Sequence, residues 1–515
     1  MKRVQLIVGL LLLIGCGSII AQTSNGTGGG NWSASATWTG GVVPTGSGTI
    51  TIKSGDSIYI DVAVTITGTL RSYSGKIGVF DSSKVVFGNG GVYEHDVDAG
   101  MLPKATWNTG STCLIDSIVT KSPTNGNQNF YNLTWNCPRQ SAGLNLGMNG
   151  NTIGGSVRVI SSNYTAASKY AFRLTAPSSS VARKPITIKG NVIIDDTTGM
   201  LTANGSSTVD TLAVYLGGNI ISHGIFQLAN GSAATCNWFV AGNIQALGGS
   251  FTTNSDSTKP DSMIFNGTTK QSFVKAGSVG SMSNIYFDVR GGAILDMDTS
   301  SFGASAFTRF TLEAGGTLIT GSTKGFEGNL NNGGAKILSS GANYVFDGDS
   351  AQVTGMLMPT TVNNLTINNA KGVALSQTIT INGVLTLTAG QLDNTIPFIL
   401  GPNATISYGG GSLKIPVTSV PEDRTSLPLR FFVDQNYPNP FNPSTKISYG
   451  IPRASFVTVK VFNLLGQDVK TLFSGYESAG IYTLSFDASK LSSGIYFYKI
   501  QAGSSVEIKR MMLVK

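Results

Sequence analysis

A chain of 515 residues with 65 glycines, 41% hydrophobic residues and only 12% charged residues has the composition of a turn-rich β protein, and it is too apolar to be disordered. The formal net charge of +8 does not indicate nucleic-acid binding, because the basic residues are scattered singly rather than interleaved with aromatic residues. Two histidines, no zinc-protease motif and no Gly-x-Ser-x-Gly elbow leave metallo-hydrolase and serine-hydrolase activities without local support.

The N-terminus has the organisation of a secretory signal peptide. Basic residues at the start precede an apolar run over residues 4–20, and Ala21 offers a site for ordinary signal peptidase, which predicts a signal peptide at residues 1–21. The alternative is a lipobox, because Leu13-Ile14-Gly15-Cys16 would place a lipid on Cys16. No other stretch is apolar for 18 residues, so we expect no transmembrane helix in the mature protein.

Periodic patterns begin shortly after the predicted signal peptide. Every second residue over 58–66 is apolar, which predicts a strand with one buried face. An apolar strand that stops at Gly-Asn and resumes with an apolar pair then occurs three times, at residues 186–193, 214–221 and 239–244. The glycines before the asparagines are 28 and then 24 residues apart, a spacing typical of one solenoid coil.

A longer pattern joins Phe-Asx-Gly, a following Gln, and a segment of Asn-apolar-polar-apolar. It occurs with Gln271 at residues 265–287 and with Gln352 at residues 346–367, and residues 132–135 are a partial copy. Such repeats suit stacked coils, because no single coil can bury its apolar face alone. We therefore expect an all-β chain with an elongated right-handed parallel β-helix; the alternative is a row of β-sandwich domains.

Three cysteines follow the predicted signal peptide, and an odd number does not make a disulfide framework. They are Cys113, Cys137 and Cys236. Cys113 and Cys137 lie in similar sequence contexts, and stacked coils could bring them together in one disulfide. The alternative is a pair of small buried thiols.

The densest acidic cluster lies at residues 94–98. Asp96 and Asp98 are two residues apart, so on a strand they point the same way and are candidate Ca²⁺ ligands. The same spacing recurs at residues 296–298 and 347–349. The alternative role for these carboxylates is the capping of turns between coils. We expect no other metal and no cofactor.

β-Helices also host polysaccharide lyases and glycoside hydrolases, which need carboxylates gathered on one groove. Asp195 and Asp196, or the cluster around Asp96, are candidates, and catalysis would need partners from adjacent coils. Tryptophans could serve as platforms for sugar stacking, although burial is their commoner role. They are Trp32, Trp38, Trp107, Trp135 and Trp238.

Residues 416–428 contain three prolines, which predicts an extended linker. It divides the chain into a β-helical unit at residues 22–415 and a C-terminal unit at residues 429–515. The C-terminal unit opens with three closely spaced prolines in residues 436–445, which predict a stiff, extended entry strand. The strand and turn patterns that follow predict a small antiparallel β-sandwich.

Four motifs occur in order in the C-terminal unit. They are NYPNPFNPST at residues 436–445, VFNLLGQDV at 461–469, LSSGIYFYKI at 491–500 and a basic-apolar end, KRMMLVK, at 509–515. Together they resemble the type A C-terminal sorting domain of type IX secretion. The residues that carry this resemblance are Asn436, Pro438, Asn439, Pro440, Phe441, Asn442, Pro443, Gly494, Tyr496 and Lys515.

The resemblance implies that residues 429–515 have no activity of their own and address the rest of the chain to an outer-membrane translocon. It also implies, as a second partner, a sortase-like peptidase that can attach the protein to anionic lipopolysaccharide. We therefore expect a secreted or outer-membrane surface protein with a structural, adhesive or glycan-binding role. An extracellular glycan is a candidate partner and nucleic acid is not; the alternative is a polysaccharide lyase or glycoside hydrolase.

Overall fold

The computed structural model describes residues 21–78, 82–176, 183–205, 210–230, 234–253, 260–276, 279, 282, 284–302, 309–331, 334–415 and 430–515. Residues 1–20 of the predicted signal peptide, with Cys16, lie outside this range, and so does the whole of the predicted linker. The chain divides into two compact units, Met1–Pro416 and Val417–Lys515.

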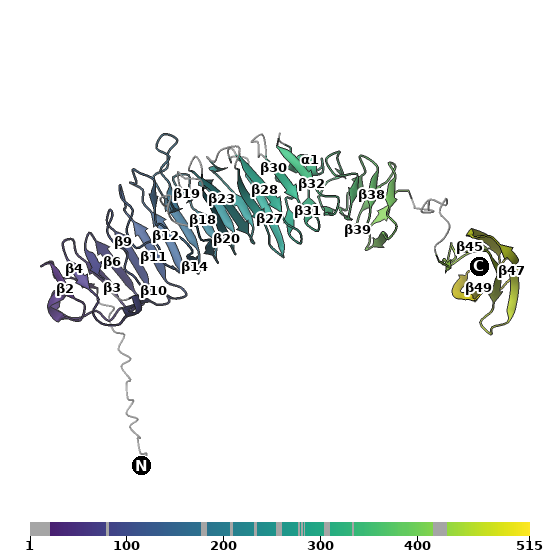
Figure 1. Cartoon of the computed structure of the whole chain (residues 1–515), viewed down its shortest axis with the longest axis horizontal. Coiled ribbons are helices and arrows are strands. Elements are labelled where there is room, and N and C mark those ends of the chain that lie inside the picture. The colour runs from purple at the N-terminus through teal and green to yellow at the C-terminus, as the bar shows by residue number, and fades with distance from the viewer. Residues whose placement is uncertain are drawn as a thin grey trace, which may run out of the picture. The chain divides into compact units, whose positions relative to one another are not determined.

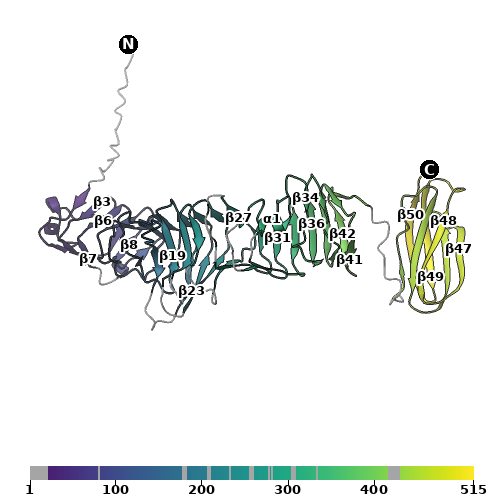
Figure 2. The ribbon, with the colours of Figure 1, turned by 90° about the horizontal axis from the view of Figure 1, so that it is seen from above.

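The first unit is a parallel β-solenoid whose coils stack in chain order (Figures 1 and 2). Its largest sheet has 17 strands, one from each successive coil, and all of its pairings are parallel. In spatial order the strands are β1 (Gln22–Thr23), β3 (Thr49–Ile52), β6 (Thr69–Tyr73), β9 (Val92–Asp96), β11 (Thr112–Asp116), β12 (Asn132–Asn136), β15 (Val157–Ser161), β18 (Val192–Ile194), β21 (Ile220–Ser222), β24 (Ile244–Ala246), β27 (Lys270–Lys275), β29 (Ile294–Asp296), β31 (Thr317–Thr320), β33 (Asn343–Phe346), β36 (Asn364–Asn368), β39 (Val384–Ala389) and β42 (Thr405–Tyr408).

Shorter parallel sheets form the remaining sides of the coils. The second strands of the coils are β2 (Gly29–Asn31), β4 (Ser57–Tyr59) and β7 (Lys76–Gly78); β13 (Leu144–Asn145), β16 (Phe172–Thr175), β19 (Met200–Asn204), β22 (Ile225–Ala229) and β25 (Ser250–Thr252); and β34 (Gln352–Val353), β37 (Val373–Ala374), β40 (Gln391–Asp393) and β43 (Ser412–Leu413). The remaining strands are β5 (Val64–Ile66), β8 (Val85–Phe87) and β10 (Thr106–Trp107); β14 (Thr152–Ile153), β17 (Ile186–Ile188), β20 (Asp210–Leu216), β23 (Ala234–Val240), β26 (Asp261–Phe265), β28 (Ile285–Val289), β30 (Arg309–Leu312) and β32 (Ala335–Leu338); and β35 (Thr361–Val362), β38 (Ile379–Ile381) and β41 (Phe398–Leu400).

Helix is confined to short turns in the described residues: α1 (Phe326–Asn329) and the 3₁₀ turns η1 (Ser35–Thr37), η2 (Thr39–Gly41) and η3 (Ser82–Lys84). None of the helices in this part of the chain has the length and apolar character needed to cross a bilayer. The structure thus confirms the predicted β-solenoid, and the alternative of a row of sandwich domains is wrong.

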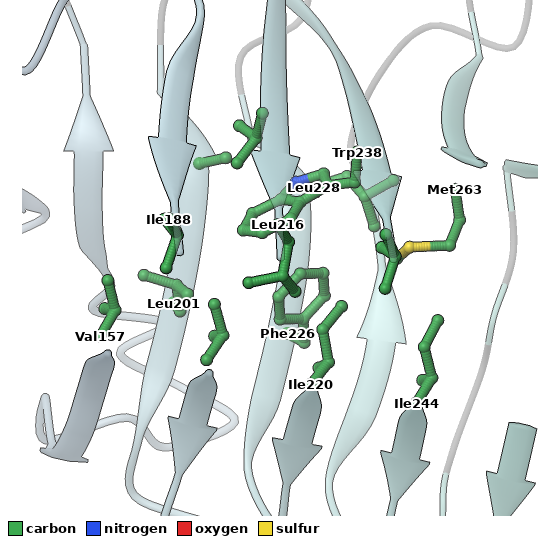
Figure 3. Packing of buried hydrophobic residues seen from close by; sticks show 14 of the residues in the cluster. Val157, Ile188, Leu201, Leu216, Ile220, Phe226, Leu228, Trp238, Ile244 and Met263 are labelled. Carbon is green, nitrogen blue, oxygen red and sulfur yellow. The ribbon is translucent and has the colours of Figure 1, made fainter. Parts of the chain in front are cut away.

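One large apolar core fills the interior of the solenoid (Figure 3), and Ala171, Met200 and Ile225 form a separate small cluster. Inward-facing positions alternate with outward-facing ones along each strand, so that Ile186 and Ile188 are buried while Thr187 between them is half-buried. Parallel register places like residues above one another, as with Ile220 and Ile244. Each coil therefore buries its apolar face only against its neighbours, which explains the length of the array.

The alternating run at residues 58–66 is interrupted by a corner of the coil rather than forming one strand. Ile58 and Ile66 are buried in β4 and β5, whereas Val62 between them is 40% exposed. Asp61 accepts hydrogen bonds from the backbone N–H and the hydroxyl of Ser33, which fixes the turn. Because the period-two alternation continues across the corner, the sequence alone overestimates the length of the strand.

The repeated Gly-Asn pairs form a ladder of hydrogen bonds at one corner of the coils. The side-chain oxygen of Asn191 accepts from the backbone N–H of Asn219 at 2.8 Å, and Asn219 accepts in the same way from Asn243 at 2.7 Å. The preceding glycines permit close stacking, because a Cβ on Gly218 would lie 2.4 Å from the carbonyl oxygen of Gly190. The repeat thus encodes the contact between coils.

The glutamine of the longer repeat is buried and joins neighbouring coils. Gln271 accepts from the backbone N–H of Gly267 at 2.8 Å and donates to the carbonyl oxygens of Val240 and Gly242 at 2.9 and 2.7 Å. Gln352 makes the equivalent set of hydrogen bonds in a later coil. The pattern therefore has a structural explanation, because a buried amide must satisfy its donors and its acceptor.

The hypothesis of a disulfide between Cys113 and Cys137 is wrong. Both cysteines are buried free thiols, and so is Cys236. Parallel register places Cys113 opposite Leu133, four residues before Cys137, and the Cys137 thiol donates instead to the carbonyl oxygen of Ile115 at 3.7 Å. Burial raises the pKa of Cys137 to about 12, so this thiol is inert as a nucleophile.

The second unit is the predicted antiparallel β-sandwich. Its two sheets have three and four strands and enclose a core that includes Ile447, Val459 and Tyr498. The strands are β44 (Phe432–Val433), β45 (Ser444–Ile451) and β48 (Gly480–Asp487) in one sheet, and β47 (Asp468–Glu477), β46 (Ser455–Phe462), β49 (Gly494–Ala502) and β50 (Ser505–Leu513) in the other.

The proline-rich opening of this unit is not the extended entry strand that the sequence predicts. Strand β45 begins only at Ser444, and before it the chain makes isolated bridges at Tyr437 and Phe441. Proline has no backbone N–H to donate to a ladder, so this segment pairs only at non-proline residues, at Tyr437 before the first proline and at Phe441 between the second and the third. The peptide bonds preceding Pro438, Pro440 and Pro443 are cis.

Candidate functional site

Asp98, one of the two candidate Ca²⁺ ligands, caps a turn of the next coil. Its carboxylate accepts hydrogen bonds from the backbone N–H groups of Val119, Thr120 and Lys121 at 2.8–3.0 Å, and from the Thr120 hydroxyl at 2.5 Å. Burial alone would raise the pKa of Asp98, but these hydrogen bonds outweigh it and lower the pKa to about 2. Both carboxylate oxygens are therefore engaged by the protein.

The other acidic candidates do not gather on one surface around a metal site. Asp96 lies opposite Asp116 in the next strand, and in the part of the chain that the structure describes, no three His, Cys, Asp or Glu side chains are placed to hold a metal ion. Asp195 forms an ion pair with Arg158 at 2.8 Å, and Asp196 accepts hydrogen bonds from the backbone and hydroxyl of Thr198 at 2.7 Å. Ion pairing thus accounts for the carboxylate of Asp195, and turn capping for that of Asp196.

The tryptophans offer no sugar platform on the surface. Trp32, Trp38, Trp135 and Trp238 are at most 2% exposed, and Trp107 is 8% exposed and stacked on Phe87. Trp32 and Trp38 pack edge to face at 5.0 Å beside the first strands of the solenoid. The hypothesis of exposed tryptophan platforms is wrong, because these side chains belong to the core.

The surroundings of Asp347 oppose the charge of its carboxylate. Burial, followed by repulsion from Asp296, raises the pKa of Asp347 to about 6, against the attraction of Lys270. Lys270 is itself paired with Asp296 at 2.7 Å, so it neutralises the acidic pair only in part.

Asp347→Asn is expected to stabilise the protein at pH 7.5 by about 1 kcal/mol, after discounting for solvent screening of this partly exposed group. The folded-state pKa of about 6 lies above the ordinary 3.8, so the folded chain binds more protons between these values and stability falls as pH rises through them. At pH 4 the substitution should therefore bring little gain. Urea unfolding at the two pH values measures this, with the exposed Asp349→Asn as control, and an equal effect at both would contradict it.

Two hollows on the N-terminal coils form one groove. A hollow of about 620 Å³ is lined by Tyr59, Lys76 and Met101 among others, and one of about 770 Å³ lies between Lys104 and Asn145. Both are lined by Lys104, Thr124 and Asn125, so they meet there. We call this surface the N-terminal groove.

The walls of the N-terminal groove combine apolar and polar groups. Tyr59 is 44% and Met101 is 50% exposed. A Cβ on Gly78 would lie 2.8 Å from the Tyr59 ring, so this glycine lets the ring lie against the backbone of the next coil. The side-chain amide of Asn145 makes no hydrogen bond to any described residue. Such walls provide stacking surface and hydrogen-bonding groups without a buried pocket.

In the second unit, the proline-rich segment and the last strand are joined directly. The side chain of Asn439 accepts from the backbone N–H of Met512 at 2.9 Å and donates to the carbonyl oxygen of Arg510 at 3.3 Å. Phe441 is 2% exposed, and its backbone exchanges hydrogen bonds with Met512 and Val514 at 2.9 and 3.0 Å. Motifs at opposite ends of this unit thus form one structure.

Asn436 fixes the start of the same segment. Its backbone N–H donates to the hydroxyl of Tyr498 at 2.9 Å, and its side-chain amide donates to the carbonyl oxygen of Pro438 and to the hydroxyl of Thr445 at 3.1 and 3.0 Å. Asn436 is 1% exposed, so these hydrogen bonds satisfy a buried amide.

The remaining motif residues lie around the end of β50. Gly494 pairs with Leu513, and the Tyr496 hydroxyl donates to the carbonyl oxygen of Ser492 at 2.8 Å. The Lys515 ammonium donates to the carbonyl oxygen of Ser489 at 2.6 Å. Asn442 is exposed, and the carbonyl oxygen of Pro443 accepts from the backbone N–H of Ala488 at 2.9 Å.

Residues 435–515 match the family model of the secretion system C-terminal sorting domain. The C-terminal unit is a type IX sorting domain. Comparisons of the chain with curated proteins and with solved structures gave no significant match.

The sorting domain makes this chain a type IX secreted protein, with export to the cell surface or the surroundings through the type IX secretion system. The motifs quoted from the sequence contain Met512 and Tyr498, but the sequence does not show that Asn439 contacts Met512 or that Asn436 contacts Tyr498. It also missed the residues of the N-terminal groove, because Tyr59, Lys76 and Lys104 come from separate coils and carry no common motif.

Proposed function

We propose that the solenoid is a glycan-binding, adhesive module that the sorting domain carries to the outside of the cell. The observation that carries this proposal is the N-terminal groove, which is open and lined by exposed Tyr59 and Met101 together with side-chain amides. Sugars present apolar faces and hydroxyl edges, and such a groove offers partners for both. Of the acidic candidates for a lyase or hydrolase, Asp98 and Asp196 instead cap turns and Asp195 forms an ion pair.

The export route completes the proposal. A signal peptide at residues 1–21 would take the chain across the inner membrane, and residues 429–515, after a linker at 416–428, would address residues 22–415 to the translocon. A sortase-like peptidase would then act in the linker region and join the solenoid to anionic lipopolysaccharide. Asn439, Phe441 and Lys515 support recognition at one place, because they lie around the same final strand.

Tyr59→Ala is expected to weaken glycan binding about fivefold, because stacking of an aromatic ring contributes about 1 kcal/mol beyond the area that it buries. Binding of the purified full-length protein to immobilised neutral and acidic polysaccharides measures this. Tyr408→Ala is the matched control, since Tyr408 is 61% exposed on β42, outside the groove. Wild-type protein that binds none of the polysaccharides would contradict the proposal.

A further inference from the structure

The charged side chains that line the N-terminal groove, among the described residues, are both lysines. Among the residues that the structure describes, no Asp or Glu lines either hollow, whereas the exposed Lys76 and Lys104 line the groove. Among the described residues neither lysine has a carboxylate partner, in contrast to Lys270 and Lys414, which pair with aspartates at 2.7 and 2.6 Å. The groove therefore presents two ammonium groups whose charge no carboxylate of the described residues neutralises.

The N-terminal groove crosses successive coils, so its long direction follows the solenoid axis. Tyr59 in β4 lies opposite Gly78 in β7, Met101 forms a parallel bridge with Thr124, and the backbone N–H of Asn145 donates to Ser122 at 2.8 Å. These residues come from five successive coils, which at the ordinary strand spacing of about 4.8 Å span roughly 20 Å. A ligand that fills the groove is therefore linear and several units long.

Three properties of the N-terminal groove restrict the class of ligand. The lysines favour a ligand that carries negative charge, and the exposed Tyr59 and Met101 favour one with an apolar face. The side-chain amide of Asn145 can form hydrogen bonds with hydroxyl groups of the ligand. Single-stranded nucleic acid fits less well, because it needs a series of aromatic platforms along a strongly basic track, and this groove has one exposed tyrosine and two lysines.

We infer that the N-terminal groove binds a linear polysaccharide bearing carboxylate groups, a polyuronate, with Lys76 and Lys104 pairing with its carboxylates and Tyr59 stacking on a sugar ring. This inference rests on the proposed function, since it names the ligand of the same groove. Because the lysines are exposed, their contribution falls as salt is added.

The test compares full-length wild-type protein with Lys76→Gln/Lys104→Gln and with the control Lys324→Gln/Lys371→Gln. The control removes the same charge from two exposed lysines outside the groove that have no ion pair with a described residue. The probes are polygalacturonate, alginate and hyaluronate, with fully methyl-esterified polygalacturonate as the uncharged match and single-stranded DNA as the other polyanion.

Wild-type protein should bind at least one polyuronate about tenfold more tightly than the methyl ester and the DNA, and more weakly as salt rises. The groove variant should lose about tenfold in affinity and the control variant should not. Equal binding of neutral and acidic polysaccharides, unaffected by the groove substitutions, overturns this inference and leaves the proposed function standing. Binding to no polysaccharide overturns both, and DNA binding as tight as polyuronate binding overturns the assignment of ligand class.

Discussion

Gln352→Leu is expected to lower the free energy of unfolding of the solenoid by about 4 kcal/mol. The side-chain amide of Gln352 makes hydrogen bonds of 2.8–3.0 Å with Gly348, Asn369 and two carbonyl groups of the coil before it, and it is 2% exposed. Leucine has a similar size but leaves these buried groups unpaired, and each unpaired group costs about 1–3 kcal/mol, partly offset by the apolar burial of leucine.

Urea unfolding followed by circular dichroism measures this loss. Gln245→Leu is the matched control, because Gln245 is a half-buried residue of β24 for which the described residues provide no side-chain hydrogen bond. The control should change the free energy of unfolding by less than about 0.5 kcal/mol. Similar effects of the two substitutions would show that the buried amide does not hold the coils together.

Phe441→Ala is expected to prevent export of the protein. Phe441 packs in the core of the sorting domain with Phe486 at a ring-centroid distance of 6.1 Å, and its backbone holds the last strand through Met512 and Val514. Truncating a buried phenylalanine costs about 3–5 kcal/mol, which is most of the stability of a domain this small. The first and last motifs of the sorting domain would then separate, and the type IX secretion system would no longer recognise the domain.

Protease digestion of intact cells expressing each variant measures the fraction displayed outside. Phe456→Ala is the control, since Phe456 lies on β46 but is 47% exposed and outside the core of the sorting domain. Deletion of residues 429–515 should match Phe441→Ala and leave the solenoid inside the cell envelope. Surface display of Phe441→Ala at the wild-type level would refute the requirement for the folded motif.

The solenoid was predictable because its repeats follow from local chemistry. Asparagine recurs at the coil spacing, at Asn191 and Asn219, because the side-chain oxygen of each accepts from the backbone N–H of the next asparagine. Glutamine recurs at Gln271 and Gln352 because a buried amide needs the same hydrogen-bond partners in each coil. These constraints act within one or two coils, and a sequence displays them directly.

Features that depend on contacts across the fold were not predictable in the same way. The contact of Asn439 with Met512 joins residues 73 apart in sequence, and the N-terminal groove collects single residues from separate coils. Whether a tryptophan such as Trp135 faces the core or the solvent depends on which face of its strand is inward. In β12 the inward position is that of Leu133 and Trp135, both fully buried.

The direction of the hydrogen bonds between coils has a mechanical consequence. The bonds from Asn219 to Asn191 and from Asn243 to Asn219 connect one coil to the next, so a pull along the solenoid axis loads them lengthwise rather than in shear. Such a load would detach coils in turn from one end. Each release of 24–28 residues would add chain of about 90 Å in extended length. A solenoid anchored at one end and attached to a ligand at the other would therefore lengthen under tension in steps, dissipating force while the remaining coils stay folded.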